Sequence, residues 1–169
     1  MKKIVFISAV SGVGKSTTCN YIKDNNLLVD YDIYDIDDLV NINNYDKNTY
    51  NLFYEDAINE AIIKSEKQNI IIASCINPND IENITIPNNV ESLEMFLVYC
   101  SNEELEKRLK SRDENRNCSS DEFIKEQIEY QKYLLEQSNK FQLSIDNTNI
   151  TVEEVANQIT NHLNKNNIK

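Results

Sequence analysis

The most chemically informative stretch of the sequence is a glycine-lysine loop near its start. Residues 9–16 read AVSGVGKS and match the phosphate-binding pattern GxxxxGK[ST], except that Ala9 stands at the first glycine position. Gly12 and Gly14 are the two glycines of the chain, so backbone freedom is kept at this one place. Such a loop points several main-chain N–H groups inward, where they bind polyphosphate oxygens beside the positive end of the next helix. The pattern therefore predicts a nucleotide-binding loop.

Each polar side chain of this loop has an expected task. Lys15 places a point charge near the β- and γ-phosphates, and the hydroxyl of Ser16 binds Mg²⁺. Thr17 lies beside the α-phosphate. The residues expected to contact the nucleotide through this loop are Ser11, Gly12, Val13, Gly14, Lys15, Ser16 and Thr17.

A pair of carboxylates forms the second candidate group. Asp35 and Asp37 end an apolar and aromatic stretch, residues 27–37, which is predicted to contain the second strand. Two positions apart at a strand end, their side chains leave on one face, about 7 Å apart. That separation suits a division of labour: one carboxylate, with Asp35 assigned to it, binds the metal, and the other accepts a proton from an acceptor hydroxyl. Asp38 is a lesser candidate, and a solvated acidic loop is the alternative.

All three arginines of the chain, Arg108, Arg112 and Arg116, lie within nine residues. Arg108 and Arg112 are four apart on one predicted helix face, and Arg116 follows in a polar loop without a hydrophobic anchor. Guanidinium groups stabilise the charge on a transferring phosphoryl group, and a closing flap keeps water out. The pattern predicts a small lid at about residues 112–120, with a charged helix surface as the alternative.

The elements that must position these groups follow from hydrophobic periodicity. The β-branched run at residues 2–8 does not alternate, which is typical of a strand buried on both faces. Apolar residues at i, i+3, i+4 and i+7 predict a helix at 50–62. Further strands are predicted at 69–76, 93–100 and 141–146. Strands that alternate with helices indicate an α/β fold, with a parallel sheet covered by helices on both faces.

Three helix starts are predicted from capping boxes, in which a hydroxyl and a carboxylate three residues apart satisfy free N–H groups reciprocally. These pairs are Ser101 with Glu104, Ser119 with Glu122, and Thr151 with Glu154.

Three aromatic residues at helical spacing are assigned to core packing, with the lining of an acceptor pocket as a lesser interpretation. They are Tyr50, Phe53 and Tyr54. Strand termination and packing are assigned to Ser74, Cys75 and Asn77.

Composition narrows the classes of function. With 17 Lys and Arg against 28 Asp and Glu, the formal net charge is −11, which opposes the basic surface that nucleic-acid binding needs. The apolar runs have the length of strands, so no membrane span is expected. The four cysteines lack CxxC spacing, which favours reduced thiols in the cytoplasm. Residues 1–169 are expected to form a single domain, monomeric or homodimeric, with an acceptor-binding region at about 38–67.

The chain resembles the small phosphate-loop (P-loop) kinases of the nucleoside, nucleoside monophosphate, shikimate and gluconate kinase superfamily over almost its whole length. The segments that carry the resemblance are AVSGVGKST, YDIDDL, IIIASCINPND, EKRLKSRDENR and SIDNTNITVEEVANQI. The resemblance implies a three-layer P-loop NTPase fold, a five-stranded parallel sheet in the order 2-3-1-4-5, and ATP and Mg²⁺ as cofactors.

The resemblance also implies roles for individual residues. Arg108 would lie near the adenine and Arg112 would contact phosphates, while Asp35 and Asp37 look like the acidic pair of the acceptor site. The segment after the fifth strand, Asp146, Asn147 and Thr148, would shape the base pocket.

The expected activity is transfer of the ATP γ-phosphoryl group to a small-molecule acceptor, a nucleoside or nucleotide. The catalytic residues are expected to be Lys15, Asp35, Asp37 and Arg112. Because every arginine is assigned to the lid, a neutral hydroxyl acceptor is slightly favoured over one with a second phosphate. The alternatives are a shikimate- or gluconate-type kinase of a small hydroxy acid, and an ATP-binding regulatory module without an acceptor.

Overall fold

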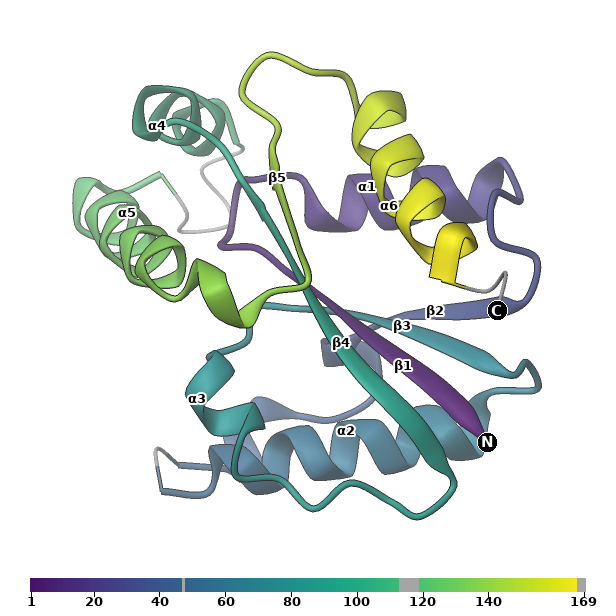
Figure 1. Ribbon diagram of the computed structural model, residues 1–169. Helices are drawn as coiled ribbons and strands as arrows, with labels where there is room; N and C mark the ends of the chain where they lie inside the picture. Colours follow the sequence, from purple (N-terminus) through teal and green to yellow (C-terminus); the bar gives the residue numbers. More distant parts are fainter. Residues whose placement is uncertain (47, 113–118, 167–169) are drawn as a thin grey trace.

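A five-stranded parallel sheet forms the centre of the protein in a computed structural model, which describes residues 1–46, 48–112 and 119–166 (Figure 1). Across the sheet the strand order is β2-β3-β1-β4-β5, and every neighbouring pair is parallel. This is the order that the resemblance implied. The strands are β1 (Lys2–Ser8), β2 (Tyr31–Asp35), β3 (Asn69–Ser74), β4 (Val90–Tyr99) and β5 (Leu143–Asp146).

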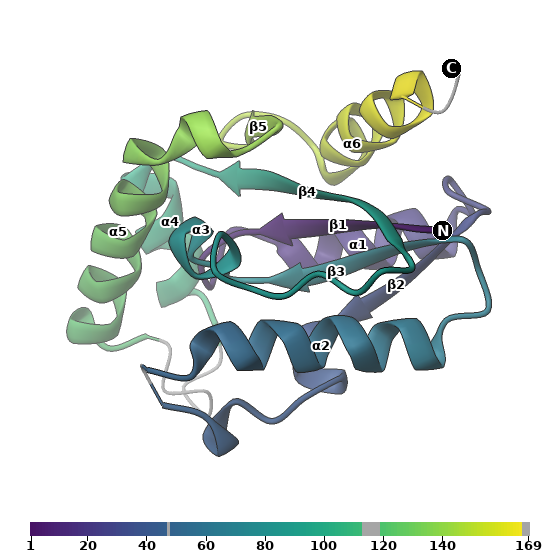
Figure 2. The same ribbon diagram turned by 60° about the horizontal axis from the view of Figure 1, so that its bottom comes forward.

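Helices cover both faces of this sheet and so make the predicted three layers. In Figures 1 and 2, α1 and α6 lie together on one face, and α2 lies on the other. The helices α4 and α5 lie beyond the carboxyl ends of the strands, towards which the arrowheads point. The bounds are α1 (Lys15–Asp24), α2 (Tyr50–Lys64), α3 (Pro78–Ile81), α4 (Asn102–Lys110), α5 (Asp121–Glu136) and α6 (Val152–Asn166).

The buried central strand β1 leads directly into the glycine-lysine loop and positions its first residues. Its residues Ile4 to Ile7 have no exposed surface, because helices cover both faces of the sheet at this point. β3 and β4 flank the strand, with Ser8 in register with Ser74 on one side. The hydroxyl of Ser8 also accepts the N–H of Ile76 at 3.2 Å. The loops after β1 and β3 are therefore joined where both strands end.

Of the three predicted capping boxes, one is complete, one forms in half and one is wrong. Thr151 and Glu154 bond reciprocally. The hydroxyl of Ser101 accepts the N–H of Glu104, but the N–H of Ser101 donates to Oγ1 of Thr148, and the carboxylate of Glu104 pairs with Arg108. At α5 the cap is Ser120, one residue later than predicted, and it accepts the N–H of Phe123 at 3.2 Å. Either of the adjacent serines fits the local pattern. Capping by Ser120 places two acidic residues in the first turn, where the helix dipole stabilises negative charge.

The short helix α3 was not predicted, because a proline between two strands also indicates a turn. Asn77 caps it by accepting the N–H of Asn79 at 3.1 Å, and Pro78 occupies its first position. Asparagine followed by proline is a favourable helix start, since proline has no N–H to lose there. The helix matters for the site because it carries Asp80 to the carboxyl end of the sheet.

Candidate active site

The glycine-lysine loop joins β1 to α1 at the carboxyl edge of the sheet, as predicted. Gly12 and Gly14 have φ angles of 95° and 105°, in the left-handed region that residues with a side chain rarely adopt. Gly14 also precedes the first turn of α1. The N–H groups of Lys15, Ser16 and Thr17 lie in that first turn, where no carbonyl of the same helix can accept them. The loop therefore presents a set of oriented N–H donors at a positive helix end.

Gly12 is required for a second reason, which is the close packing of the loop on α4. A Cβ atom at this position would lie 2.8 Å from Cδ2 of Leu109 and 3.0 Å from Cδ1 of Leu105. Both leucines are fully buried. At Gly14 an added Cβ would make only an ordinary van der Waals contact, with Nδ2 of Asn147 4.0 Å away. Gly12 is therefore required both for its φ angle and for close packing on α4, whereas Gly14 is required for its φ angle alone.

A hollow of about 250 Å³ lies over the loop, and we call it the loop hollow. Its volume suits an anion the size of a phosphate group. Arg112 reaches it from the end of α4, where its guanidinium donates to Oγ of Ser11 at 3.3 Å. The hollow is lined by Val10, Ser11, Gly12, Gly14, Lys15, Ser16, Thr17 and Arg112.

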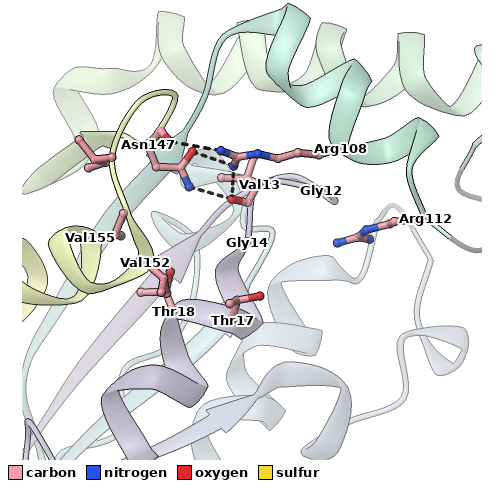
Figure 3. A pocket seen from close by; sticks show the side chains of 11 residues that line it. Gly12, Val13, Gly14, Thr17, Thr18, Arg108, Arg112, Asn147, Val152 and Val155 are labelled. Atoms are coloured by element: carbon pink, nitrogen blue, oxygen red, sulfur yellow. Dashed lines mark hydrogen bonds between the residues drawn. The ribbon is translucent and has the colours of Figure 1, made fainter. Parts of the chain in front are cut away.

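A second hollow, of about 290 Å³, adjoins the first on the side of α6, and we call it the α6 hollow (Figure 3). Arg108 and Asn147 meet above Val13 at its upper edge, and Val152 and Val155 lie on the side opposite Arg112. The lining is Gly12, Val13, Gly14, Thr17, Thr18, Arg108, Arg112, Asn147, Ile150, Val152 and Val155. A cavity with a polar rim and an apolar floor suits a planar base attached to the phosphates.

Arg108 holds the edge of this hollow together. Its guanidinium donates to the carbonyl oxygen of Val13 at 2.9 Å and to Oδ1 and the carbonyl oxygen of Asn147 at 3.1 and 3.2 Å. Its Nε donates to Glu104 at 2.8 Å, which lowers the pKa of that carboxyl. The buried Asn147 adds a bond from Nδ2 to the carbonyl oxygen of Val13 at 2.8 Å. The loop after β1, helix α4 and the loop after β5 are thus locked to one another.

Asn147 is the only member of the predicted base-pocket trio that lines the α6 hollow. Asp146 and Thr148 instead bond to each other, the N–H of Thr148 donating to Asp146 at 2.9 Å. Oγ1 of Thr148 then accepts the N–H of Ser101 at 2.7 Å. These two residues fasten the loop to the start of α4. Sequence reasoning missed four further lining residues, Thr18, Ile150, Val152 and Val155, because residues at such positions also fit ordinary packing of α1 and α6 on the core.

A third cavity, of about 380 Å³, opens between the ends of β2 and β3, and we call it the β2–β3 pocket. It adjoins the loop hollow at Lys15, which lines both. Its volume lies in the range that small-molecule sites occupy. The lining is Lys15, Asp35, Ile36, Asp37, Ile42, Tyr50, Phe53, Tyr54, Ser74, Cys75, Asn77, Asp80 and Tyr130.

Both predicted carboxylates line this pocket, but the geometric reason differs from the prediction. β2 ends at Asp35, and Asp37 lies in a 3-10 turn at Ile36–Asp38. Oδ1 of Asp35 caps that turn by accepting the N–H of Asp37 at 3.3 Å. The alternation of a strand therefore does not apply to this pair, and the turn brings both groups to one cavity. Asp38 does not line it.

Ser16 and Asp35, the two predicted metal ligands, lie together. The hydroxyl of Ser16 donates to Oδ2 of Asp35 at 3.3 Å. Magnesium in phosphate sites is held by one or two protein oxygens, and phosphate oxygens and water complete the octahedron. No group of three or more His, Cys, Asp and Glu side chains in the described residues could hold a metal by itself. The donor set therefore fits an ion that arrives with a nucleotide.

Phe53 and Tyr54 of α2 pack in the core and also line the pocket, and the half-buried Tyr50 lines it as well. The lesser interpretation of these aromatic residues, as the lining of an acceptor pocket, therefore applies to all three. Burial raises the pKa of Tyr54, and also that of Tyr130 on α5. Cys75 is exposed and lines the pocket. Asp80 and Tyr130 were missed, because α3 was not predicted and α5 carries no local sign of a site.

Several predictions fall in part or wholly on residues that the structure does not describe. Arg116 and most of the predicted lid lie within 113–118, outside the described residues. The expected acceptor region at 38–67 supplies four lining residues of the β2–β3 pocket, and the remainder come from the ends of β2 and β3, α1, α3 and α5.

Comparison with known proteins agrees with this geometry. A family model described as an AAA domain matches residues 5–131, which span the loop, the first four strands and most of α5. The chain belongs to this AAA domain family. A search of curated protein sequences gave no significant match.

Solved structures with a similar fold include three proteins of related size. A tunicamycin resistance protein from Deinococcus radiodurans has a TM-score of 0.65 at 14% identity, and the alignment covers 96% of both chains. A gluconokinase from Sinorhizobium meliloti 1021 has a TM-score of 0.64 at 15% identity, covering 97% of this AAA-domain chain and 92% of the other. A shikimate kinase from Acinetobacter baumannii in complex with shikimate has a TM-score of 0.59 at 14% identity, covering 100% and 96%. The resemblance to small P-loop kinases is confirmed, and with it the kinase-like P-loop fold.

Within the described ranges, no helix is both long enough and apolar enough to cross a membrane.

Proposed function

We propose that the protein is an ATP-dependent phosphotransferase that moves the γ-phosphoryl group of ATP to a hydroxyl of a small molecule. The observation that carries this proposal is the position of Lys15. Its side chain lines the loop hollow, which suits phosphates, and also the β2–β3 pocket, which contains two carboxylates and suits a small molecule. A donor and an acceptor bound in these cavities would meet at this ammonium group.

The donor side would act by positioning and by electrostatic stabilisation. The N–H groups of the loop and Lys15 bind the β- and γ-phosphates, and Arg112 adds a guanidinium at the same hollow. Ser16 and Asp35 would hold Mg²⁺, which neutralises phosphate charge when it is bound. The α6 hollow would receive the base, against Val152 and Val155.

The acceptor side would supply the proton acceptor. The acceptor hydroxyl attacks the γ-phosphorus in line with the departing ADP oxygen, and its proton passes to a carboxylate. Asp37 is the better placed base, because Asp35 already bonds Ser16 at the expected metal position. Holding the two reactants in adjoining cavities makes the reaction effectively unimolecular, which is a large part of the rate gain.

A nucleoside or nucleotide is the acceptor class that the sequence favours, and the pocket offers aromatic faces for a base. The net charge of −11 supports a small-molecule acceptor over a nucleic acid. We also propose that the reaction takes place in the cytoplasm, because Cys19, Cys75 and Cys100 are free thiols.

The proposal is tested by measuring ADP formation from ATP and Mg²⁺ with pooled acceptors. The pools are nucleosides, nucleoside monophosphates, sugar acids and simple alcohols, and the phosphorylated product is identified by mass spectrometry. Acceptor-dependent ADP formation supports a kinase. ATP binding with slow hydrolysis that no acceptor accelerates would indicate a regulatory ATP-binding module instead.

A further inference from the structure

The charges of the β2–β3 pocket do not suit an anionic acceptor. Three carboxylates line it, Asp35, Asp37 and Asp80, and Lys15 is the one cation among its described lining residues. That ammonium group also faces the loop hollow, where phosphates would occupy it. Arg112 lines both of the other hollows, and Arg108 lines the α6 hollow. A carboxylate or phosphate on the acceptor would therefore enter a cavity of its own sign without a free partner.

Asp80 is the carboxylate of this pocket that the proposed reaction does not use. It lies at the third position of α3, where an acidic side chain often caps the helix by accepting the N–H of the cap residue. Here that N–H, of Asn77, donates to Oη of Tyr54 at 3.4 Å. No lysine or arginine in the described residues forms an ion pair with Asp80. Lys140, near the same helix, pairs with Glu82 at 2.7 Å.

The surroundings of Asp80 disfavour its charged form. Desolvation by burial raises its pKa, and a hydrogen bond with the side chain of Asn77 lowers it by less. A carboxylate that is partly withdrawn from water without a cation destabilises the folded state. A cationic ligand would remove this penalty by supplying the missing partner.

Aromatic rings stand beside this carboxylate. The charge of Asp80 contributes to the raised pKa values of both Tyr54 and Tyr130, so all three lie within electrostatic reach of one another. Tyr50 and Phe53 complete the aromatic part of the lining. The faces of aromatic rings attract ammonium groups, and the attraction grows when the site excludes water. A carboxylate among tyrosines is thus a suitable site for an amine.

We propose that the acceptor is an alcohol that carries a protonated amino group, and that Asp80 binds this group as a specificity-determining residue. The inference rests on the proposed phosphoryl transfer, and it replaces the nucleoside or nucleotide acceptor that the sequence favours with an amino alcohol. The amine would lie against Asp80 and the tyrosines, and the reacting hydroxyl would face Lys15 and Asp37. Hydroxy acids and nucleotides would be rejected.

The test uses three probes with one aromatic body and one common hydroxyl, which differ in charge. These are 2-amino-1-phenylethanol as the cation, 1-phenylethane-1,2-diol as the neutral form and mandelate as the anion. Their binding to the full chain is measured by titration calorimetry with ADP and Mg²⁺ present. We expect the cation to bind about tenfold more tightly than the diol, and mandelate to show no binding.

Two variants show whether Asp80 is responsible. In Asp80→Asn, the affinity for the cation falls about tenfold, to that of the diol, and the affinity for the diol is unchanged. The matched control is Asp24→Asn, which removes an exposed carboxylate at the end of α1, outside the pocket. This control leaves all three affinities unchanged. Thermal unfolding of each variant verifies that it is folded.

The inference is overturned if mandelate binds as tightly as the cation, if no probe binds, or if Asp80→Asn leaves the preference for the cation intact. Failure of the proposed phosphotransferase gives a different result. In that case the cation binds in an Asp80-dependent way, but no amino alcohol accelerates ADP formation. Transfer to a hydroxy acid or a nucleotide would support the phosphotransferase and exclude the amine-binding role of Asp80.

Discussion

The two halves of the site differ both in charge and in where their residues come from. The nucleotide half, which comprises the loop hollow and the α6 hollow, is built around the continuous segment 10–18 and contains Arg108 and Arg112. The acceptor half, the β2–β3 pocket, is acidic and aromatic, and its lining comes from separate elements after β2 and β3 and on α1, α2 and α5. Phosphate recognition depends on one local backbone shape. Recognition of the acceptor depends on how distant elements are packed.

Lys15 gives the strongest test of this division of the site, because its side chain lines both halves. We expect Lys15→Ala to lower kcat/KM about a thousandfold, because the charge that stabilises the transferring group is removed. The free energy of unfolding stays within about 0.5 kcal/mol of the original value. Lys23→Ala, on the same helix and outside both halves, is the matched control and keeps its activity. Unchanged turnover in a folded Lys15→Ala protein would contradict the assignment.

Asp37 separates acceptor chemistry from nucleotide binding. Asp37→Asn should lower kcat about a hundredfold while ATP affinity is retained, because only the proton acceptor is lost. Asp38→Asn serves as the control, since this exposed neighbour does not line the pocket. Steady-state kinetics and calorimetry with ATP measure the two effects separately. A loss of ATP affinity instead of kcat would place Asp37 at the metal and leave Asp35 as the base.

The two glycines test how the nucleotide half is supported. Gly12→Ala should lower the free energy of unfolding by about 3 kcal/mol, because strain at positive φ is combined with a clash against Leu109. Gly14→Ala has the strain alone and should cost about 1 kcal/mol. Urea unfolding of both variants gives the difference. Equal decreases in the free energy of unfolding would show that α4 shifts to accommodate the extra methyl group at position 12.

Arg108 tests whether the edge of the α6 hollow is held by its guanidinium. In Arg108→Ala we expect ATP affinity to fall about tenfold, because the bonds to Val13 and Asn147 are lost. Lysine at this position should not restore binding, since one ammonium group cannot reproduce a planar set of donors. Lys107→Ala removes a neighbouring exposed cation and should leave ATP affinity unchanged. A similar loss in both variants would point to the general charge of α4.

The smallest expected effect concerns stability in the acceptor half. Because the pKa of Asp80 is raised by folding, the unfolded chain loses this proton at lower pH than the folded chain. The contribution to stability is therefore present at low pH and declines as the pH rises through the unfolded and then the folded pKa. Asp80→Asn removes the decline, so this variant should be more stable than the original protein at pH 7. Urea unfolding at pH 4 and pH 7 measures the change, and lower stability at pH 7 would show that Asp80 serves the fold.

The sequence was sufficient for those parts of the site whose residues are close along the chain. The segment at residues 9–16, placed between a buried strand and a helix, determines the loop because its shape needs only glycine torsions and the start of a helix. The sheet followed from β-branched runs alternating with amphipathic segments. Sequence reasoning was less successful at Ser119, where the adjacent Ser120 is an equivalent cap, and at α3, where a proline also fits a turn between strands.

The amino-acid sequence by itself determined that this chain would form a parallel α/β sheet with a polyphosphate loop at its carboxyl edge, since both depend on short-range torsions and periodicity. Only the tertiary structure decided which side chains face the second cavity. Asp80 and Tyr130 are fifty residues apart and carry no shared pattern, yet they line one pocket with Lys15. Packing of α3 and α5 against the ends of the strands brings them together, and such long-range placement leaves no periodic signal in the sequence.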